Sequence, residues 1–444
     1  MRKTLFFFLL SMLATVMQAE NYPYRSDFLW VTNPDHADWL YKTGEKAQVE
    51  VELYHYGMPY NGTVTYEVAP DMLKATESGT VEMKNGKAII NVGTRETPGF
   101  KDLRMEATID GIKTKHHMKV GYDVDGIQPY TKEPKDFMKF WQKALAEARK
   151  TPITYTRELA KEYCTDKIDC WLIKLQTDKD HYIYAYLTMP KNAKAGSLPA
   201  VLCPPGAGVK TIKEPLRHKY YAENGIIRLE AEIHGMHPKS TAAEFQHRAD
   251  SLGKGLPGAY IGRDADNMDK YYMKRVYIAM VRCLDFLTQL PEWDGKDLAV
   301  QGGSQGGALA IIASALDNRV TACCANHPAL TDMAGYAEEG RTGGYPHFKP
   351  EFLTPQVQKT LQYYDVINFA HHVKCPTRLT WGYNDSTCPP TTSYAAMHSL
   401  PNVKSVVLTP INEHWTSDNM EKQHCDWIMS VFGMPNAGNA IKSK

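Results

Sequence analysis

The sequence has little net charge, no low-complexity tract and few long apolar runs. Its 51 lysines and arginines nearly balance 50 aspartates and glutamates, which gives a formal net charge of +1 at pH 7. Such a chain has no global electrostatic attraction for nucleic acid or for cationic partners. With 43% hydrophobic and 23% charged residues, its composition is that of a globular protein. The length of 444 residues exceeds one ordinary domain and predicts two.

The one marked apolar run lies at the N-terminus and is shorter than a membrane span. Arg2 and Lys3 precede an apolar stretch at 5–12, and Ala19 offers a small residue at a plausible cleavage point. No other segment approaches twenty apolar residues, so no spanning helix is expected. We therefore predict a signal peptide at 1–19 and an exported mature protein, periplasmic or secreted, without an integral membrane segment.

Cysteine is present without a spacing that indicates a zinc site. The count of nine is odd, so at least one thiol has no partner within the chain. Several cysteines lie in apolar strand or helix patterns, where cysteine behaves as a small hydrophobe. Cys164 and Cys170 are close enough for a local disulfide in an oxidising compartment, and the sequence leaves that pairing open. We expect no metal and no other cofactor.

Residues 20–122 have the pattern of an all-β domain. Val49, Val51 and Leu53 alternate with polar residues, and the turn dipeptide at 61–62 leads into the next alternating run. About six short strands separated by turns predict a small immunoglobulin-like β-sandwich. The pattern is compatible with glycan binding, with covering of an active-site mouth, with assembly or with a structural spacer, and it favours the spacer.

From 123 to 436 the pattern changes to alternating strands and helices. Strand-like runs at 200–203 and 226–233 are followed by a helical pattern at 271–290. Such alternation predicts an α/β domain with a mainly parallel, doubly wound sheet and helices on both faces. Residues 437–444 form a tail.

The strongest single motif lies within the segment 297–316. An apolar run meets Gly302-Gly303-Ser304-Gln305-Gly306, after which small and aliphatic residues recur at helical spacing. A strand, a sharp turn and a helix around G-x-S-x-G are the setting of a nucleophile elbow. Glycines beside the serine relieve crowding between strand and helix. Ser304 is therefore the predicted nucleophile.

A serine nucleophile needs a histidine base, which a carboxylate orients. On α/β-hydrolases the chain order is serine, acid, histidine. Asp385 follows the strand-like run 377–381, and His414 lies in the loop after the next one, 405–408. We predict Asp385 and His414 as the acid and base. The competing residues better fit caps, turns, helices or the wrong edge of the sheet: Asp332, Asp365, Asp418, His371, His372 and His398.

Catalysis also needs donors for the carbonyl oxygen as it becomes negative. The backbone N–H of Gln305, directly after the nucleophile, is one predicted donor. The backbone N–H of Ala207, in the Pro/Gly-rich loop 204–208, is the other. The residues predicted to line the substrate pocket are Gly206, His234, His237, His327 and Trp415.

With these residues assigned, the chain resembles the acetyl xylan esterase / cephalosporin C deacetylase family of carbohydrate esterases. The similarity runs from about 123 to 432. It implies an α/β-hydrolase that removes acetyl groups from sugars or small alcohols without a metal, often as an oligomer. It also places the family's triad on Ser304, Asp385 and His414. The segments that carry the similarity are 134–141, 269–287, 291–310, 363–376 and 385–400.

The chain departs from this family at positions that would contact the substrate. Family members usually have His-Gly-Tyr where this chain has Pro205-Gly206-Ala207, and Arg-Gly-Gln-Gly where it has His234-Gly235-Met236-His237. They do not normally carry the preceding β-domain. The main prediction is an exported serine esterase that acts on acetylated oligo- or polysaccharides or small acetyl esters. The alternatives are a non-acetyl carboxylesterase or peptidase on the same fold, and a glycan-binding protein with a vestigial hydrolase domain.

Overall fold

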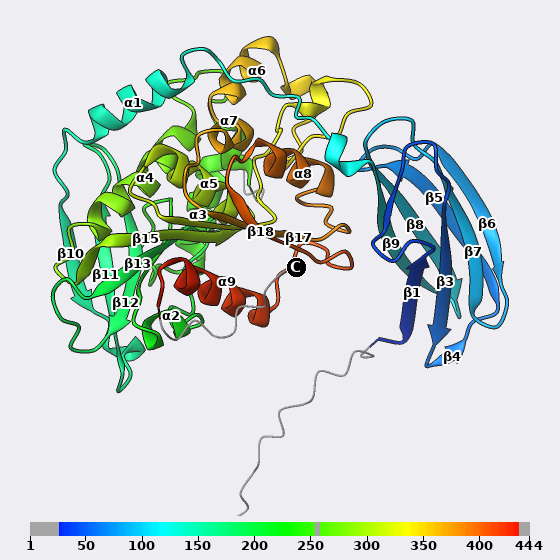
Figure 1. Ribbon diagram of the computed structural model, residues 1–444, viewed down its shortest axis with the longest axis horizontal. Coiled ribbons are helices and arrows are strands. Elements are labelled where there is room, and N and C mark those ends of the chain that lie inside the picture. Colours follow the sequence, from blue (N-terminus) through cyan, green and yellow to red (C-terminus); the bar gives the residue numbers. More distant parts are fainter. Residues whose placement is uncertain (1–25, 254–257, 435–444) are drawn as a thin grey trace, which may run out of the picture.

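A computed structural model describes residues 26–253 and 258–434, which form a β-domain and an α/β-hydrolase domain (Figure 1). The predicted signal peptide at 1–19 and the tail at 437–444 lie outside the described residues. Within the described residues, no helix is both long and apolar enough to cross a membrane.

The β-domain consists of two sheets packed around a common apolar core, and their pairings are antiparallel except for the short parallel pairing of β2 with β9. Alternate residues of the central strand, Ala47, Val49, Val51 and Leu53, are fully buried, as their sequence pattern predicts. The smaller sheet has the order β1-β3-β4, with β7 also paired to β3, and the larger has the order β2-β9-β8-β5-β6. The strands are β1 (Phe28–Pro34), β2 (Leu40–Tyr41), β3 (Ala47–His55), β4 (Met58–Pro59), β5 (Gly62–Pro70), β6 (Glu77–Met83), β7 (Lys87–Gly93), β8 (Gly99–Ile109) and β9 (Ile112–Tyr122).

The hydrolase domain is built on a nine-stranded sheet with the order β10-β11-β12-β14-β13-β15-β16-β17-β18. The first three strands are antiparallel, and those from β14 to β18 are parallel to one another, as predicted. The strands are β10 (Tyr155–Leu159), β11 (Ile168–Gln176), β12 (Tyr182–Pro190), β13 (Leu198–Cys203), β14 (Ile227–Ala231), β15 (Trp293–Gly303), β16 (Ala322–Asn326), β17 (Thr377–Trp381) and β18 (Val403–Leu408).

Helices cover both faces of this sheet (Figure 1). Neighbouring residues of a strand enter different cores: Leu202 packs in the core with α4 and α5, whereas Val201 packs in the core with α2 and α9. Both faces are therefore apolar, as a doubly wound sheet requires. The helices are α1 (Phe137–Ala148), α2 (Tyr220–Glu223), α3 (Ala242–Gly253), α4 (Tyr272–Leu287), α5 (Gln305–Leu316), α6 (Pro355–Gln362), α7 (Val366–Ala370), α8 (Pro390–Ser399) and α9 (Asp418–Val431).

The β-domain packs against the hydrolase domain near β17 and α8 (Figure 1). Phe100 of β8 belongs to the main hydrolase core and makes aromatic contacts with Tyr383 and Tyr394. The Asp71 carboxylate accepts a hydrogen bond from the Thr391 hydroxyl at 2.7 Å. The junction thus combines apolar and polar contacts and brings the β-domain to the loop that follows β17.

All nine cysteines are unpaired in the structure. Cys164 lies beside Cys170, since its Sγ atom is 3.4 Å from the Cys170 nitrogen, but the two form no disulfide. Burial raises the pKa of the Cys170 thiol to about 12, so this thiol is protonated at neutral pH and behaves as a small apolar side chain.

Candidate active site

Ser304 occupies a sharp turn between β15 and α5. Its backbone has φ 60° and ψ −125°, a conformation that a non-glycine residue rarely adopts. Two hydrogen bonds hold it: the Ser304 N–H donates to the Asn326 carbonyl, and the Ala329 N–H donates to the Ser304 carbonyl, each at 3.0 Å. A Cβ on Gly302 would lie 2.5 Å from the Gly306 backbone, so this crossing of strand and helix requires glycine.

The structure brings Ser304, His414 and Asp385 together in a chain of hydrogen bonds. Ser304 Oγ lies 2.9 Å from His414 Nε2. His414 Nδ1 lies 2.8 Å from Asp385 Oδ2. Asp385 comes from the loop after β17 and His414 from the loop after β18, so three parallel strands present the three side chains at one sheet edge. This geometry allows a histidine to withdraw the serine proton while a carboxylate holds the ring.

Asp385 is fully buried but is surrounded by donors. Its Oδ1 atom accepts hydrogen bonds from the Thr387 and Cys388 amides at 2.7 and 2.8 Å. Burial, the largest influence, raises the pKa of Asp385. The hydrogen bond and charge of His414, together with the Cys388 amide, outweigh it, so the net pKa is below the usual value. The carboxylate is therefore ionised and accepts a hydrogen bond from His414 Nδ1–H.

The β-domain also contacts the loop that carries Asp385. The Lys119 ammonium of β9 donates to the Asp385 carbonyl at 2.7 Å and pairs with Asp71 at 2.9 Å. The Lys119 backbone N–H donates to the Asn384 side chain at 2.9 Å. The Lys119 and Asp71 side chains are 0% and 1% exposed, and a lysine is almost never fully buried unless it is paired. The loop that carries Asp385, here called the acid loop, is thus hydrogen-bonded to the β-domain.

Both predicted oxyanion donors lie at the elbow. Gln305 opens α5, and a Cβ on Gly306 would lie 2.6 Å from the Pro204 carbonyl oxygen, so the loop 204–208 packs directly on this helix start. Within the described residues, neither the Gln305 nor the Ala207 N–H donates a hydrogen bond to the protein. Both amides are therefore available to an oxyanion.

Tyr260 joins the two sides of this arrangement, a role that sequence patterns did not reveal. Its hydroxyl donates to the Gln305 side-chain oxygen at 2.5 Å and accepts from the Gly208 N–H at 3.2 Å. Tyr260 is 2% exposed, and burial raises its pKa, so the hydroxyl remains protonated and able to donate. The Tyr260 side chain thereby fixes the loop 204–208, here called the oxyanion loop, relative to α5.

Three predicted pocket residues lie beside the triad or the elbow. The His327 and His414 ring centroids are 4.4 Å apart, and His327 and Trp415 both line a small cavity of about 190 Å³. Trp415 follows His414 and is 53% exposed. A Cβ on Gly206 would come within 4.0 Å of the carbonyl oxygen of Gly303. His327 and Gly206 thus lie next to the triad and the elbow, whereas no triad residue lines the cavity that Trp415 borders.

His327 is neutral in this setting. Burial, and then the neighbouring His414, lowers the pKa of His327 to about 4. Ligating atoms of His327, Asp385 and His414 lie within 4.8 Å of one another, the one such group of three found in the described part of the chain. Asp385 and His414 are hydrogen-bonded to each other, which suits a proton relay without a metal.

The other two pocket candidates lie elsewhere. His234 is 4% exposed, with Nδ1 2.8 Å from the Tyr272 hydroxyl and Nε2 3.3 Å from the Gly208 carbonyl oxygen. It therefore supports the oxyanion loop from behind instead of facing the pocket. His237 accepts from the Lys239 N–H and packs edge-on against Tyr184, away from the triad. A turn sequence does not show on which side of the loop its histidines lie.

Comparison with known proteins agrees with this geometry. Residues 123–431 match the family model for acetyl xylan esterase (AXE1). The chain is 53% identical over 432 residues to the acetyl esterase Axe7A of Xylanibacter ruminicola, an alignment that takes in 96% of both chains. That alignment therefore includes most of the β-domain, which lies outside the family match.

Solved structures share the hydrolase fold. The acetyl xylan esterase from Paenibacillus sp. R4 superposes with a TM-score of 0.60 at 26% identity, covering 69% of this chain and 98% of its own. Acetyl xylan esterase 1 from Thermoanaerobacterium sp. JW/SL YS485 gives 0.57 at 19% identity, covering 69% and 97%. Family match, sequence identity and fold lead to one conclusion: the chain is an esterase that belongs to the acetyl xylan esterase family of α/β-hydrolases.

Proposed function

We propose that this protein removes acetyl groups from xylan or related acetylated glycans by a serine acyl-enzyme mechanism. The observation that carries the proposal is the continuous hydrogen-bond chain from Ser304 through His414 to Asp385. The family match supports an acetylated carbohydrate as the substrate class.

In the first half of the reaction, His414 Nε2 takes the proton of Ser304 Oγ as this oxygen bonds to the acetyl carbonyl carbon. The carbonyl oxygen becomes negative and accepts hydrogen bonds from the Gln305 and Ala207 amides. His414 then gives the proton to the sugar oxygen, the ester bond breaks, and the acetyl group remains on Ser304. Asp385 stabilises the imidazolium that forms between these steps.

Water completes the cycle. His414 takes one proton from the water, whose oxygen attacks the acetyl-serine carbonyl. The bond to Ser304 Oγ breaks, acetate leaves, and the proton returns to the serine. The neutral state of His327 supports this relay, because a second charge beside His414 would oppose formation of the imidazolium.

We also propose that the protein is exported, to the periplasm or the medium. This rests on the basic and apolar residues at 2–12. Separation of cell fractions would test it, and activity confined to the cytoplasm would refute it.

The test of function is acetate release from acetylated xylan by Ser304→Ala. Loss of the nucleophile should lower kcat by at least roughly 10⁴-fold. Ser314→Ala is the matched control, since Ser314 is a buried serine of α5 whose hydroxyl donates to the Ala310 carbonyl. Parallel assays with longer acyl esters and dipeptides separate the alternatives: a preference for either would defeat the deacetylase assignment. Binding of glycan without any turnover would indicate a vestigial hydrolase instead.

A further inference from the structure

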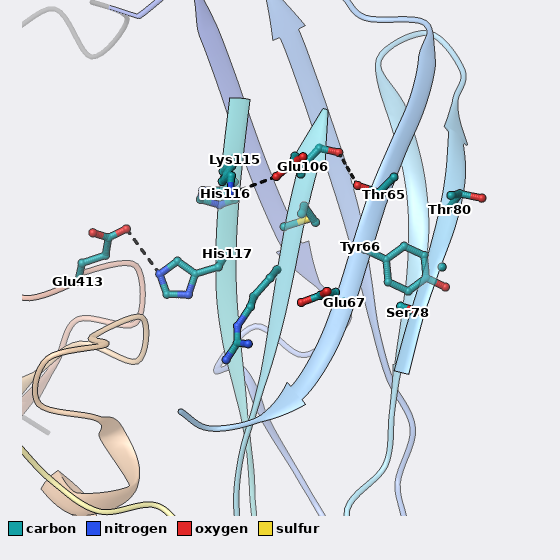
Figure 2. A pocket seen from close by; sticks show the side chains of 13 residues that line it. Thr65, Tyr66, Glu67, Ser78, Thr80, Glu106, Lys115, His116, His117 and Glu413 are labelled. Carbon is teal, nitrogen blue, oxygen red and sulfur yellow. Dashed lines mark hydrogen bonds and ion pairs between the residues drawn. The ribbon is translucent and has the colours of Figure 1, made fainter. Parts of the chain in front are cut away.

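We propose that the outer face of the larger β-domain sheet binds the polysaccharide main chain whose acetyl group is removed. This inference rests on the proposed function and adds to it the place where the rest of the glycan binds. A groove of about 840 Å³ lies on this face, and Glu413 of the hydrolase domain completes its lining (Figure 2).

The strand register sets the outward side chains of the groove in a row. Ser78, Glu67, Arg104 and His117 are successive cross-strand partners on β6, β5, β8 and β9. Four strands spaced by about 4.8 Å span roughly 14 Å. The row runs across the strands, from β6 at the sheet edge toward the hydrolase domain, and its direction suits an extended chain of sugar rings.

A second, parallel row gives the groove its width. Thr80, Thr65, Glu106 and Lys115 are partners on the same four strands, two residues along from the first row. Lys115 pairs with Glu106 at 3.1 Å. This second row borders the first with further hydroxyl and charged groups.

The groove ends beside the loop that carries the proposed base. His117 Nε2 lies 3.6 Å from Glu413 Oε1 (Figure 2), and Glu413 immediately precedes the catalytic base His414 in the chain. Two residues further along β9, Lys119 contacts Asp385. Side chains two residues apart on a strand point to the same face. The face that carries the groove is therefore the face that meets the acid loop.

Two groove residues are held in place by one buried carboxylate. Asp102, which is 2% exposed, accepts from Arg104 Nε at 2.7 Å and lies 3.0 Å from His117 Nδ1. Fixing these long side chains before binding lowers the entropy cost of ordering them. The groove is thus pre-organised at the end nearest the catalytic loop.

The chemistry of the groove suits a neutral polyhydroxylated chain. In the described part of the protein, the exposed Glu67 carboxylate and the exposed Ser78 and Thr80 hydroxyls form no hydrogen bond with other protein groups, which leaves them free for a ligand. Sugar hydroxyls both donate and accept, so they can satisfy all three. A polyanion would be repelled by the carboxylates that lie among the cations. The charged lining residues are Glu67, Arg104, Glu106, Lys115 and Glu413, with His117.

The test compares a groove variant with a matched variant of the same two strands. The groove variant combines Glu67→Gln with Ser78→Ala, and the control combines Thr63→Ala with Glu82→Gln, a register pair on the same face outside the groove. The measured quantity is kcat/KM for acetylated xylohexaose divided by kcat/KM for p-nitrophenyl acetate. This ratio cancels any effect on the chemical step.

We expect the ratio to fall roughly tenfold in the groove variant, since one hydrogen bond is lost and a charged one becomes neutral, and to stay at the wild-type value in the control. Equal ratios in the two variants would overturn the proposal.

Direct binding separates this proposal from the proposed function. In the Ser304→Ala background, titration calorimetry with unacetylated xylohexaose should give a dissociation constant that rises roughly tenfold when the groove substitutions are added. If the wild type released no acetate, the proposed function would fail. This titration would still show whether the groove binds the glycan. Displacement of xylohexaose by heparin would overturn the assignment of a neutral glycan.

Discussion

The proposed nucleophile and the proposed acid of this esterase are held in place by different means. Ser304 is fixed by glycines within its own pentapeptide and by hydrogen bonds to residues on the neighbouring strand and its loop. The loop of Asp385 instead depends on Lys119, which is 266 positions away in the chain and belongs to another domain. The hydrolase domain thus holds Ser304 by itself, whereas the β-domain also contacts the loop of Asp385. A domain that resembles a spacer in sequence therefore contacts the loop of the proposed acid.

The largest expected effect concerns the acid itself. Asp385→Asn keeps the shape of the side chain but removes the charge that stabilises the His414 imidazolium and fixes its tautomer. We expect kcat to fall by roughly 10⁴-fold with the fold preserved. Steady-state kinetics and circular dichroism check this. A loss of less than tenfold would show that Asp385 is not the acid.

The support of the acid loop can be broken from the β-domain side. Asp71→Ala leaves the buried Lys119 ammonium without its carboxylate, and we expect the free energy of unfolding to fall by about 3–5 kcal/mol. Urea unfolding measures this. Adding Lys119→Met to Asp71→Ala removes the unpaired charge. The free energy of unfolding should therefore fall less in the double variant than the sum of the decreases in the two single variants. Strict additivity would contradict a coupled pair.

Acid should destabilise the hydrolase domain through its buried histidines. Burial lowers the pKa of both His234 and His424 to about 3. In the unfolded chain both histidines are protonated as pH falls through about 6.5, whereas in the folded chain they stay neutral down to about pH 3. The free energy of unfolding is therefore highest above pH 6.5 and decreases as pH falls toward 3. Between pH 6.5 and 5 each histidine should lower the free energy of unfolding by about 2 kcal/mol. Urea unfolding of His424→Gln should show a correspondingly weaker pH dependence; an unchanged slope would contradict the buried neutral form.

The elbow side has its own support in Tyr260. Tyr260→Phe removes the hydroxyl shared by the Gln305 side chain and the Gly208 amide. We expect kcat on p-nitrophenyl acetate to fall about tenfold, because the oxyanion loop loses its fixed position. Tyr271→Phe is the matched control, since the hydroxyl of this neighbouring buried tyrosine bonds to the Ile261 carbonyl instead. Equal activities of the two variants would remove Tyr260 from this role.

Local patterns in the sequence predicted much of this architecture. The alternation around Val49 and Val51 predicted the β-domain, and the glycine-flanked Ser304 predicted the strand–turn–helix of the elbow. Asp385 and His414 followed from chain order and strand positions, and the structure places both beside Ser304. Each of these features has a local signal in the sequence, namely an alternating strand, a glycine-flanked turn or a loop directly after a strand.

What the sequence did not predict depends on partners that are distant along the chain. Lys119 alternates with apolar residues like a solvated lysine, and nothing nearby indicates that Asp385 will cover it. Tyr260 lies in a short 3-10 helix without a motif, yet it binds groups on two other elements. His234 follows β14 as predicted, but tertiary packing places its ring behind the loop.

The most direct test of the role of the β-domain compares two of its buried lysines. Lys101 pairs with Glu77 at 3.1 Å within the β-domain, whereas Lys119 reaches the Asp385 carbonyl. Both are at most 5% exposed, so Lys101→Met is a matched control for Lys119→Met. On p-nitrophenyl acetate, Lys119→Met should lower kcat at least tenfold with little change in KM, as expected from loss of a buried charged hydrogen bond, and Lys101→Met should leave kcat at the wild-type value. Equal kcat values for the two variants would contradict the claim that the β-domain positions the catalytic acid.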